Sequence, residues 1–165
     1  MKEFLDRANN FIKLEEAVRQ AQTRGVWSSI NVPKHRFILW QVVNDQLLTR
    51  NKMLQFRVLL DNVECPVCAE VAESIQHLFF ECNLSYKVAD QVQNWLGVGG
   101  WPKEFQAWKN RLVISNKNKN SRICTAVMAA MVYRLWLNRN NCVFNGFSST
   151  ITSILVLLPS AEFCL

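Results

Sequence analysis

The feature that most constrains the fold is a set of three cysteines and one histidine, spaced as Cys65-x2-Cys68-x8-His77-x4-Cys82. A two-residue gap lets both thiolates of a tight turn face one ion. A histidine one turn into a helix and a cysteine just past its end can complete a tetrahedron. Three thiolates and one imidazole suit Zn²⁺. Because four protein ligands leave no position for water or substrate, the pattern predicts one structural zinc ion and not a catalytic one.

The alternative is that these cysteines are small buried residues and that the histidine is a polar group on a helix face. Pro66 inside the turn and Ser74 at an N-cap position both favour the metal site. The other three cysteines lie far apart with no histidine nearby, and we interpret them as buried or idle thiols: Cys124, Cys142 and Cys164.

The first ten residues are charged and lack the apolar core of a secretory signal. No apolar run approaches the roughly 18–20 residues that a membrane-spanning helix needs. We therefore expect an intracellular protein with reduced cysteines and no membrane contact. No compact basic nuclear signal stands out, so nucleus and cytoplasm both stay open.

Composition favours a small all-α fold. Half of the 165 residues are apolar, and only five glycines and four prolines interrupt the chain. We expect three regions: an N-terminal amphipathic helix (1–26), a zinc-binding domain (27–146) and an irregular apolar tail (147–165). The first expected helix spans Met1–Gln22, the second begins at Pro33, and the third spans Arg50–Leu60 behind a Thr49 cap. A short helix follows Ser74, and the next spans Leu84–Leu96 with Val88, Val92, Trp95 and Leu96 inward. The last two span Pro102–Val113 and, behind a Ser121 cap, Arg122–Asn141.

Several runs together resemble a known family. They are Val32-Pro33-Lys34-His35-Arg36-Phe37-Ile38-Leu39-Trp40, Leu48-Thr49-Arg50-Asn51, Cys65-Pro66-Val67-Cys68 and His77-Leu78-Phe79-Phe80-Glu81-Cys82. In order and spacing they are similar to the zinc-binding domain downstream of the reverse transcriptase in plant non-LTR (LINE-type) retrotransposons. The stretch 136–144 is similar to the helix that often follows this domain, and 4–17 resembles the end of a retrotransposon gag domain. The resemblance implies a zinc-stabilised accessory domain of a polyprotein that copies RNA into DNA.

Nothing catalytic carries over from that resemblance. The chain has no Tyr/Phe-x-Asp-Asp motif, and its aspartates are too scattered for a two-metal site. A hydrolase is a further candidate function, and it would need a nucleophile or base arrangement. His35 is the only histidine outside the metal pattern, and between Lys34 and Arg36 at a helix start we expect it to be exposed and not part of a triad. We therefore expect no enzyme activity and no small-molecule substrate.

A net charge of +6 favours an acidic partner. The candidate contacts to RNA or DNA phosphates, without sequence preference, are Lys34, Arg36, Arg50, Lys52 and Arg57. The alternative for these basic residues is that they form an ordinary solvated face. For the chain as a whole, one alternative is a protein-interaction module that packs on a reverse-transcriptase polypeptide through the 84–96 and 122–141 helices. Another is a non-functional transposon remnant. The aromatic residues Trp27, Trp40 and Tyr86 are candidates for base stacking, although such residues are more often core.

Overall fold

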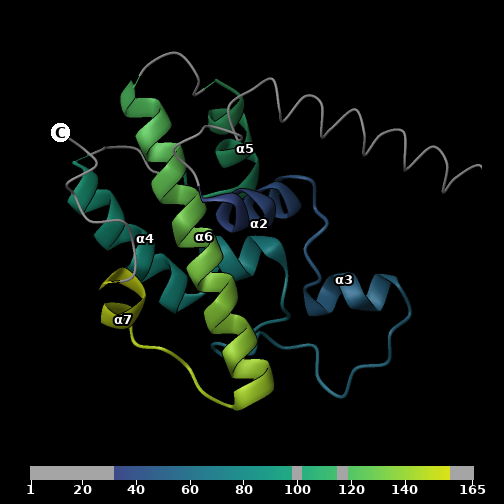
Figure 1. Cartoon of the computed structure of the whole chain (residues 1–165). Coiled ribbons are helices and arrows are strands. Elements are labelled where there is room, and N and C mark those ends of the chain that lie inside the picture. The colour runs from purple at the N-terminus through teal and green to yellow at the C-terminus, as the bar shows by residue number, and fades with distance from the viewer. Residues whose placement is uncertain (1–31, 98–101, 115–118, 157–165) are drawn as a thin grey trace, which may run out of the picture.

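A computed structural model describes residues 32–97, 102–114 and 119–156 (Figure 1). In chain order the elements are α2 (Pro33–Val43), α3 (Arg50–Gln55), the π-helical turn η1 (His77–Glu81), α4 (Asn83–Leu96), α5 (Phe105–Ile114), α6 (Lys119–Asn145) and α7 (Ile151–Val156). Within the described ranges no residue lies in a named strand, and one isolated bridge joins Glu64 to Ala72. The all-α class is confirmed. The helix expected over Met1–Gln22 lies outside the described residues.

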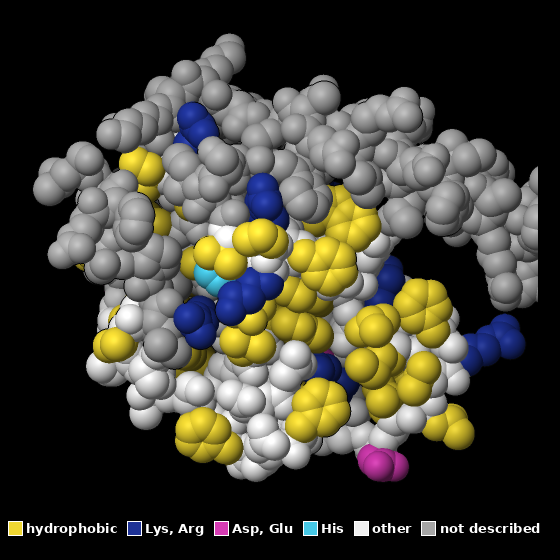
Figure 2. Space-filling view, in the orientation of Figure 1, with side chains coloured by type: hydrophobic (Ala, Val, Ile, Leu, Met, Phe, Trp, Pro, Cys, Tyr) yellow, Lys and Arg dark blue, Asp and Glu magenta, His cyan; other side chains and the backbone are white. Residues whose placement is uncertain are grey.

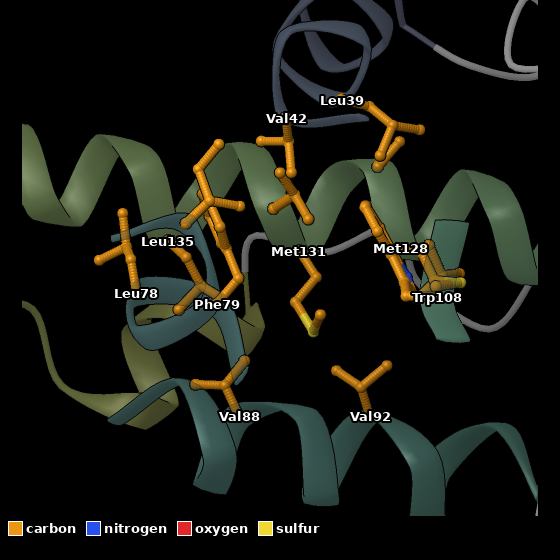
Figure 3. Packing of buried hydrophobic residues seen from close by; sticks show 14 of the residues in the cluster. Leu39, Val42, Leu78, Phe79, Val88, Val92, Trp108, Met128, Met131 and Leu135 are labelled. Atoms are coloured by element: carbon orange, nitrogen blue, oxygen red, sulfur yellow. The ribbon is translucent and has the colours of Figure 1, made fainter. Parts of the chain in front are cut away.

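The long helix α6 runs through the middle of the fold. Its residues 127–132 are all buried, which is typical of a helix with neighbours on every side. Figure 3 shows α2 on one side of it, with Leu39 and Val42, and α4 on the other, with Val88 and Val92. The valines of α4 and the central part of α6 therefore belong to the chain's own core.

Local signals place several helix ends as expected. Pro33 occupies the first turn of α2, and Val32 before it is extended, as the residue preceding a proline prefers. Thr49 caps α3 by accepting a hydrogen bond from the Lys52 N–H at 3.4 Å. Gly97 ends α4 in the left-handed conformation, with φ of 63°.

Other boundaries differ from the prediction. Arg57 has a left-handed φ of 59°, which ends α3 at Gln55 and not at Leu60. Helix α5 begins at Phe105, three residues after the expected start at Pro102. Helix α6 extends from Lys119 to Asn145, so Ser121 lies inside it and is not its cap. No glycine or proline interrupts that range, whereas Gly146 follows it with φ of 63°.

The inward face of α4 was predicted wrongly at one position. Val88 and Val92 are buried, but Trp95 is 43% exposed. Leu96, which was also predicted to face inward, lies four positions beyond Val92 and packs against the core.

The tail predicted to be irregular contains α7. The Thr150 hydroxyl accepts a hydrogen bond from the Ser153 N–H at 3.2 Å and so caps this short helix. Ile154 is buried, and α7 packs against α4 and α6. Ile154 therefore joins this part of the tail to the core.

None of the helices in the described ranges combines the length and the apolar character that crossing a bilayer requires.

Candidate metal centre

The first two sulfurs lie in a tight turn that the backbone stabilises. The Cys65 N–H donates to the Val71 carbonyl at 2.7 Å, and the Ala69 N–H donates to the Cys65 carbonyl at 2.8 Å. Ala69 has a left-handed φ of 57°, a conformation that residues with a Cβ rarely adopt. The chain therefore reverses direction directly after Cys68, as the Cys-Pro-Val-Cys pattern requires.

The histidine and the third cysteine are brought together by a π-helical turn. Ser74 accepts a hydrogen bond from the His77 N–H at 3.0 Å, which confirms it as the predicted cap. The Cys82 N–H then donates to the His77 carbonyl at 2.7 Å, an i to i+5 bond. In an α-helix, residue 81 would lie one turn after His77, whereas the i to i+5 bond places Cys82 one turn after it. The wider turn thus directs both side chains to the same side.

The four side chains form one compact cluster. One potential ligand atom from each of Cys65, Cys68, His77 and Cys82 lies within 4.8 Å of the others. Cys68 Sγ and His77 Nε2 are 3.2 Å apart. Cys65, His77 and Cys82 are buried, and Cys68 is partly buried. The cluster could hold one zinc ion.

The electrostatics of the thiols fit a cation among them. The neighbouring Cys82 thiol, with backbone hydrogen bonds from Cys68 and Val67, lowers the pKa of Cys65 to about 5, against the effect of burial. The hydrogen bond with Cys65, and then burial, raise the pKa of Cys82. These opposite shifts have a common cause, because a thiolate at Cys65 disfavours a second negative charge at Cys82. A divalent ion removes this conflict, because it stabilises neighbouring thiolates together.

A carboxylate lies near the far nitrogen of the imidazole. His77 Nδ1 lies 3.9 Å from Glu81 Oε2, on the opposite side of the ring from the nitrogen that faces Cys68. Gln76 donates to Glu81 Oε1 at 3.0 Å and accepts from the Phe105 N–H at 2.9 Å. This arrangement resembles the carboxylate partner that metal-bound histidines usually have, and it links the site to the start of α5.

A buried ion pair links the metal-binding loop to α6. Glu73 accepts two hydrogen bonds from Arg139, at 2.6 Å from Nε and 2.7 Å from Nη2. Glu73 is 0% exposed and Arg139 is 2% exposed. The same carboxylate accepts from the Arg50 N–H at 2.7 Å, and the Glu73 carbonyl accepts from the Asn51 N–H at 3.1 Å. Glu73 therefore joins three parts of the chain: the loop, the start of α3 and α6.

The basic residues predicted to contact nucleic acid fall into two groups. Lys34 and Arg36 lie on α2, next to α6. There the Lys34 ammonium lies 5.2 Å from the centroid of the Tyr133 ring, and the Arg134 guanidinium lies 6.0 Å from the same ring. Sequence reasoning missed Tyr133 and Arg134 because they lie about a hundred residues away in the chain.

The second group lies on and after α3, where acidic or carbonyl oxygens compensate two of its charges. Lys52 forms an ion pair with Asp45 at 2.8 Å. Arg50 donates from Nη1 to the Glu64 carbonyl at 2.7 Å. Arg57 is exposed. Because of these contacts Lys52 and Arg50 are weaker candidates for phosphate contacts than Lys34, whereas Arg57 stays a candidate.

The expectation that His35 is exposed was wrong. It is buried, and its ring lies 4.7 Å from the Tyr133 ring. Burial, followed by the nearby charges of Lys34 and Arg134, lowers the pKa of His35 below its ordinary value of 6.5. Its Nε2 atom is buried without a hydrogen-bond partner in the described part of the chain.

The remaining predicted residues are placed as follows. Trp40 is a core residue and Tyr86 is half exposed on α4. Trp27 and Cys164 lie outside the described residues. Cys124 and Cys142 are partly buried, lie outside the metal cluster and form no disulfide within the described residues.

Comparison with known proteins gives one match. No curated protein and no solved structure matches the chain. The family match begins at residue 8, inside the stretch that resembles a gag domain, and ends inside α4. Residues 8–88, which include all four clustered side chains, are similar to a protein family described as zinc-binding in reverse transcriptase.

Proposed function

We propose that this chain is a zinc-stabilised, non-catalytic accessory module of the kind found in plant LINE-type reverse transcriptases, and that it contacts the phosphate backbone of RNA or DNA. The metal part rests on the geometry of the cluster and on the family match. The nucleic-acid part rests mainly on one observation, the absence of acidic residues on the packed helix pair α2 and α6.

Cys65, Cys68, His77 and Cys82 would hold the ion, and three soft thiolates with one imidazole select zinc over magnesium or calcium. Bound zinc would supply a structural cross-link of the loop. Four protein ligands fill a tetrahedral shell and leave no place for a reacting water, which supports a structural role. The energy of such a cross-link, on the order of 10 kcal/mol in small zinc modules, is comparable with the stability of a whole domain.

Helices α2 and α6 carry basic side chains and no acidic ones. Neither sequence contains an aspartate or a glutamate, whereas Lys34, Arg36, Arg122 and Arg134 are basic. Figure 2 shows Lys and Arg side chains beside a His side chain on this face. A face with one sign of charge attracts the nucleic-acid backbone without reading its sequence.

The metal is tested by elemental analysis of the purified chain. We expect one zinc per chain, and we expect Cys65→Ser and Cys82→Ser to lose it. Cys142→Ser is the matched control, because this thiol lies outside the cluster. A zinc-free wild-type chain, or zinc retained in both ligand variants, would rule out the assigned site.

Nucleic-acid binding is tested by titrating labelled single-stranded and duplex oligonucleotides at several salt concentrations. Contacts to about four to six phosphates predict a slope of about −4 to −5 in a plot of log K against log salt for duplex DNA. The double variant Lys34→Gln/Arg134→Gln should reduce the slope by about 2, one for each lost contact. Lys52→Gln is the control, since its charge is already paired with Asp45. If the wild-type chain does not bind, or if its affinity does not depend on salt, the proposal fails.

A further inference from the structure

An exposed apolar surface surrounds α3. We call residues 48–63 the α3 arm. None of the six helical residues in it is buried. The large apolar side chains that the arm exposes are Leu48, Leu54, Phe56, Val58, Leu59 and Val63, with Leu59 99% exposed. Figure 1 shows α3 to one side of the other helices, and Figure 2 shows hydrophobic side chains gathered over it.

The arm is fixed in place although it is not packed. Backbone N–H groups of Arg50 and Asn51 donate to Glu73, and the Arg50 guanidinium donates to the Glu64 carbonyl. Polar bonds therefore set the position of the arm while its apolar side chains face outward. An apolar cluster of this kind in a soluble protein usually marks an interaction surface, because each large side chain gains about 1.5–3 kcal/mol when fully buried.

We propose that the α3 arm is the docking surface for the N-terminal segment Met1–Gln22 of the same chain. This segment has an apolar face at three- and four-residue steps, formed by Phe4, Leu5, Ala8, Phe11, Ile12, Leu14, Ala17 and Val18. An amphipathic helix gains most of its stability by packing this face, and a short helix alone in water is only marginally stable. The segment needs an apolar partner, and the arm offers one.

The family match supports this pairing. It runs without a break from residue 8 to residue 88, so most of the segment and the whole arm belong to one sequence unit. That unit ends before α5, α6 and α7. Within its described portion, the arm is the main concentration of exposed large apolar side chains.

The chain is long enough for the contact. The ten residues from 23 to 32 can span at most about 33 Å when extended. The arm follows α2, whose eleven residues make a helix about 16 Å long. A segment that enters at the start of α2 can therefore reach the arm beyond its end.

Hydrogen exchange on the full-length, zinc-loaded chain tests the proposal. In the wild type we expect amides within residues 4–18 to exchange at least tenfold more slowly than in an unstructured peptide of the same sequence. In the double variant Phe56→Asp/Leu59→Asp this protection should be lost. Both side chains are exposed, so the rest of the fold and the zinc content should not change.

Phe144→Asp is the matched control, because Phe144 is also exposed but lies near the end of α6. It should leave the protection intact, and Phe11→Asp should abolish it. Unprotected N-terminal amides in the wild type would overturn the proposal, as would equal protection in the arm variant and the control. So would a wild-type dimer that becomes a monomer in the arm variant, since a second copy would then cover the arm.

Discussion

The Glu73–Arg139 pair allows the sharpest test of how the metal-binding loop is held on the helices. We consider Arg139→Met, which keeps much of the side-chain volume but removes the charge. Glu73 would then lose two of its three hydrogen bonds and keep only the one from the Arg50 N–H. A buried carboxylate without its cation costs about 3–5 kcal/mol. This is a large share of the roughly 5–15 kcal/mol that stabilises a typical domain.

Urea unfolding followed by tryptophan fluorescence, with zinc in excess, measures the loss. The companion variant Glu73→Leu/Arg139→Met removes both charges, and we expect it to recover most of the stability, because an apolar pair of similar volume is often as stable as a buried ion pair. Lys87→Met, an exposed substitution on α4, should stay within about 0.5 kcal/mol of the wild type. A loss of less than about 1 kcal/mol in Arg139→Met would refute the reasoning.

Three further outcomes are expected. Ala69→Gly should raise the free energy of unfolding by about 1 kcal/mol, because a Cβ is unfavourable at the left-handed φ of 57° at this position. A lower urea midpoint in the variant than in the wild type would count against this prediction. His35→Gln should reduce the loss of stability at acid pH. The folded state lowers the pKa of His35, so the unfolded state binds more protons below about pH 6.5 and the wild type loses stability there. Urea titrations at about pH 7.5 and 5.5 should show this loss in the wild type and not in the variant. Glu81→Gln should weaken zinc affinity about tenfold in a chelator competition, because the carboxylate lies near His77 Nδ1, while Glu70→Gln should not.

Local chemistry explains what the sequence predicted well. Pro33, Thr49, Ser74 and Gly97 act at helix ends within a few residues of themselves, and each lies where its backbone preference or hydrogen-bonding group implies. The spacing of the three cysteines and His77 is also local, and the structure brings these side chains together.

Three features of the structure were not predicted from the sequence, and two of them depend on tertiary contacts. The π-helical bond from Cys82 to the His77 carbonyl has no residue signature of its own, so a short α-helix was expected there. The burial of His35 depends on Tyr133 of a distant helix. The same holds for Glu73, whose pairing with Arg139 spans 66 residues along the chain.

Contacts between distant residues also change how the basic side chains are ranked as candidates. Lys52 and Arg50 lie close to Lys34 in sequence, yet their side chains contact Asp45 and the Glu64 carbonyl. Arg134 was not among the predicted contacts, because it lies far from Lys34 in the sequence. The absence of acidic residues in α2 and α6 becomes informative only once the two helices are known to pack together.

A zinc ion bound by the four clustered side chains should be coupled to the Glu73–Arg139 pair, because both would hold the same loop. Glu73 lies between Cys68 and His77, so loss of the ion releases the segment that carries the carboxylate. Once the loop opens, water can reach both charges, and the cost of removing Arg139 should fall below about 1 kcal/mol. Measuring Arg139→Met in the Cys82→Ser background tests this directly. If the cost stays at about 3–5 kcal/mol without the metal site, the loop is held on α6 by its own packing, and the ion is not what positions Glu73.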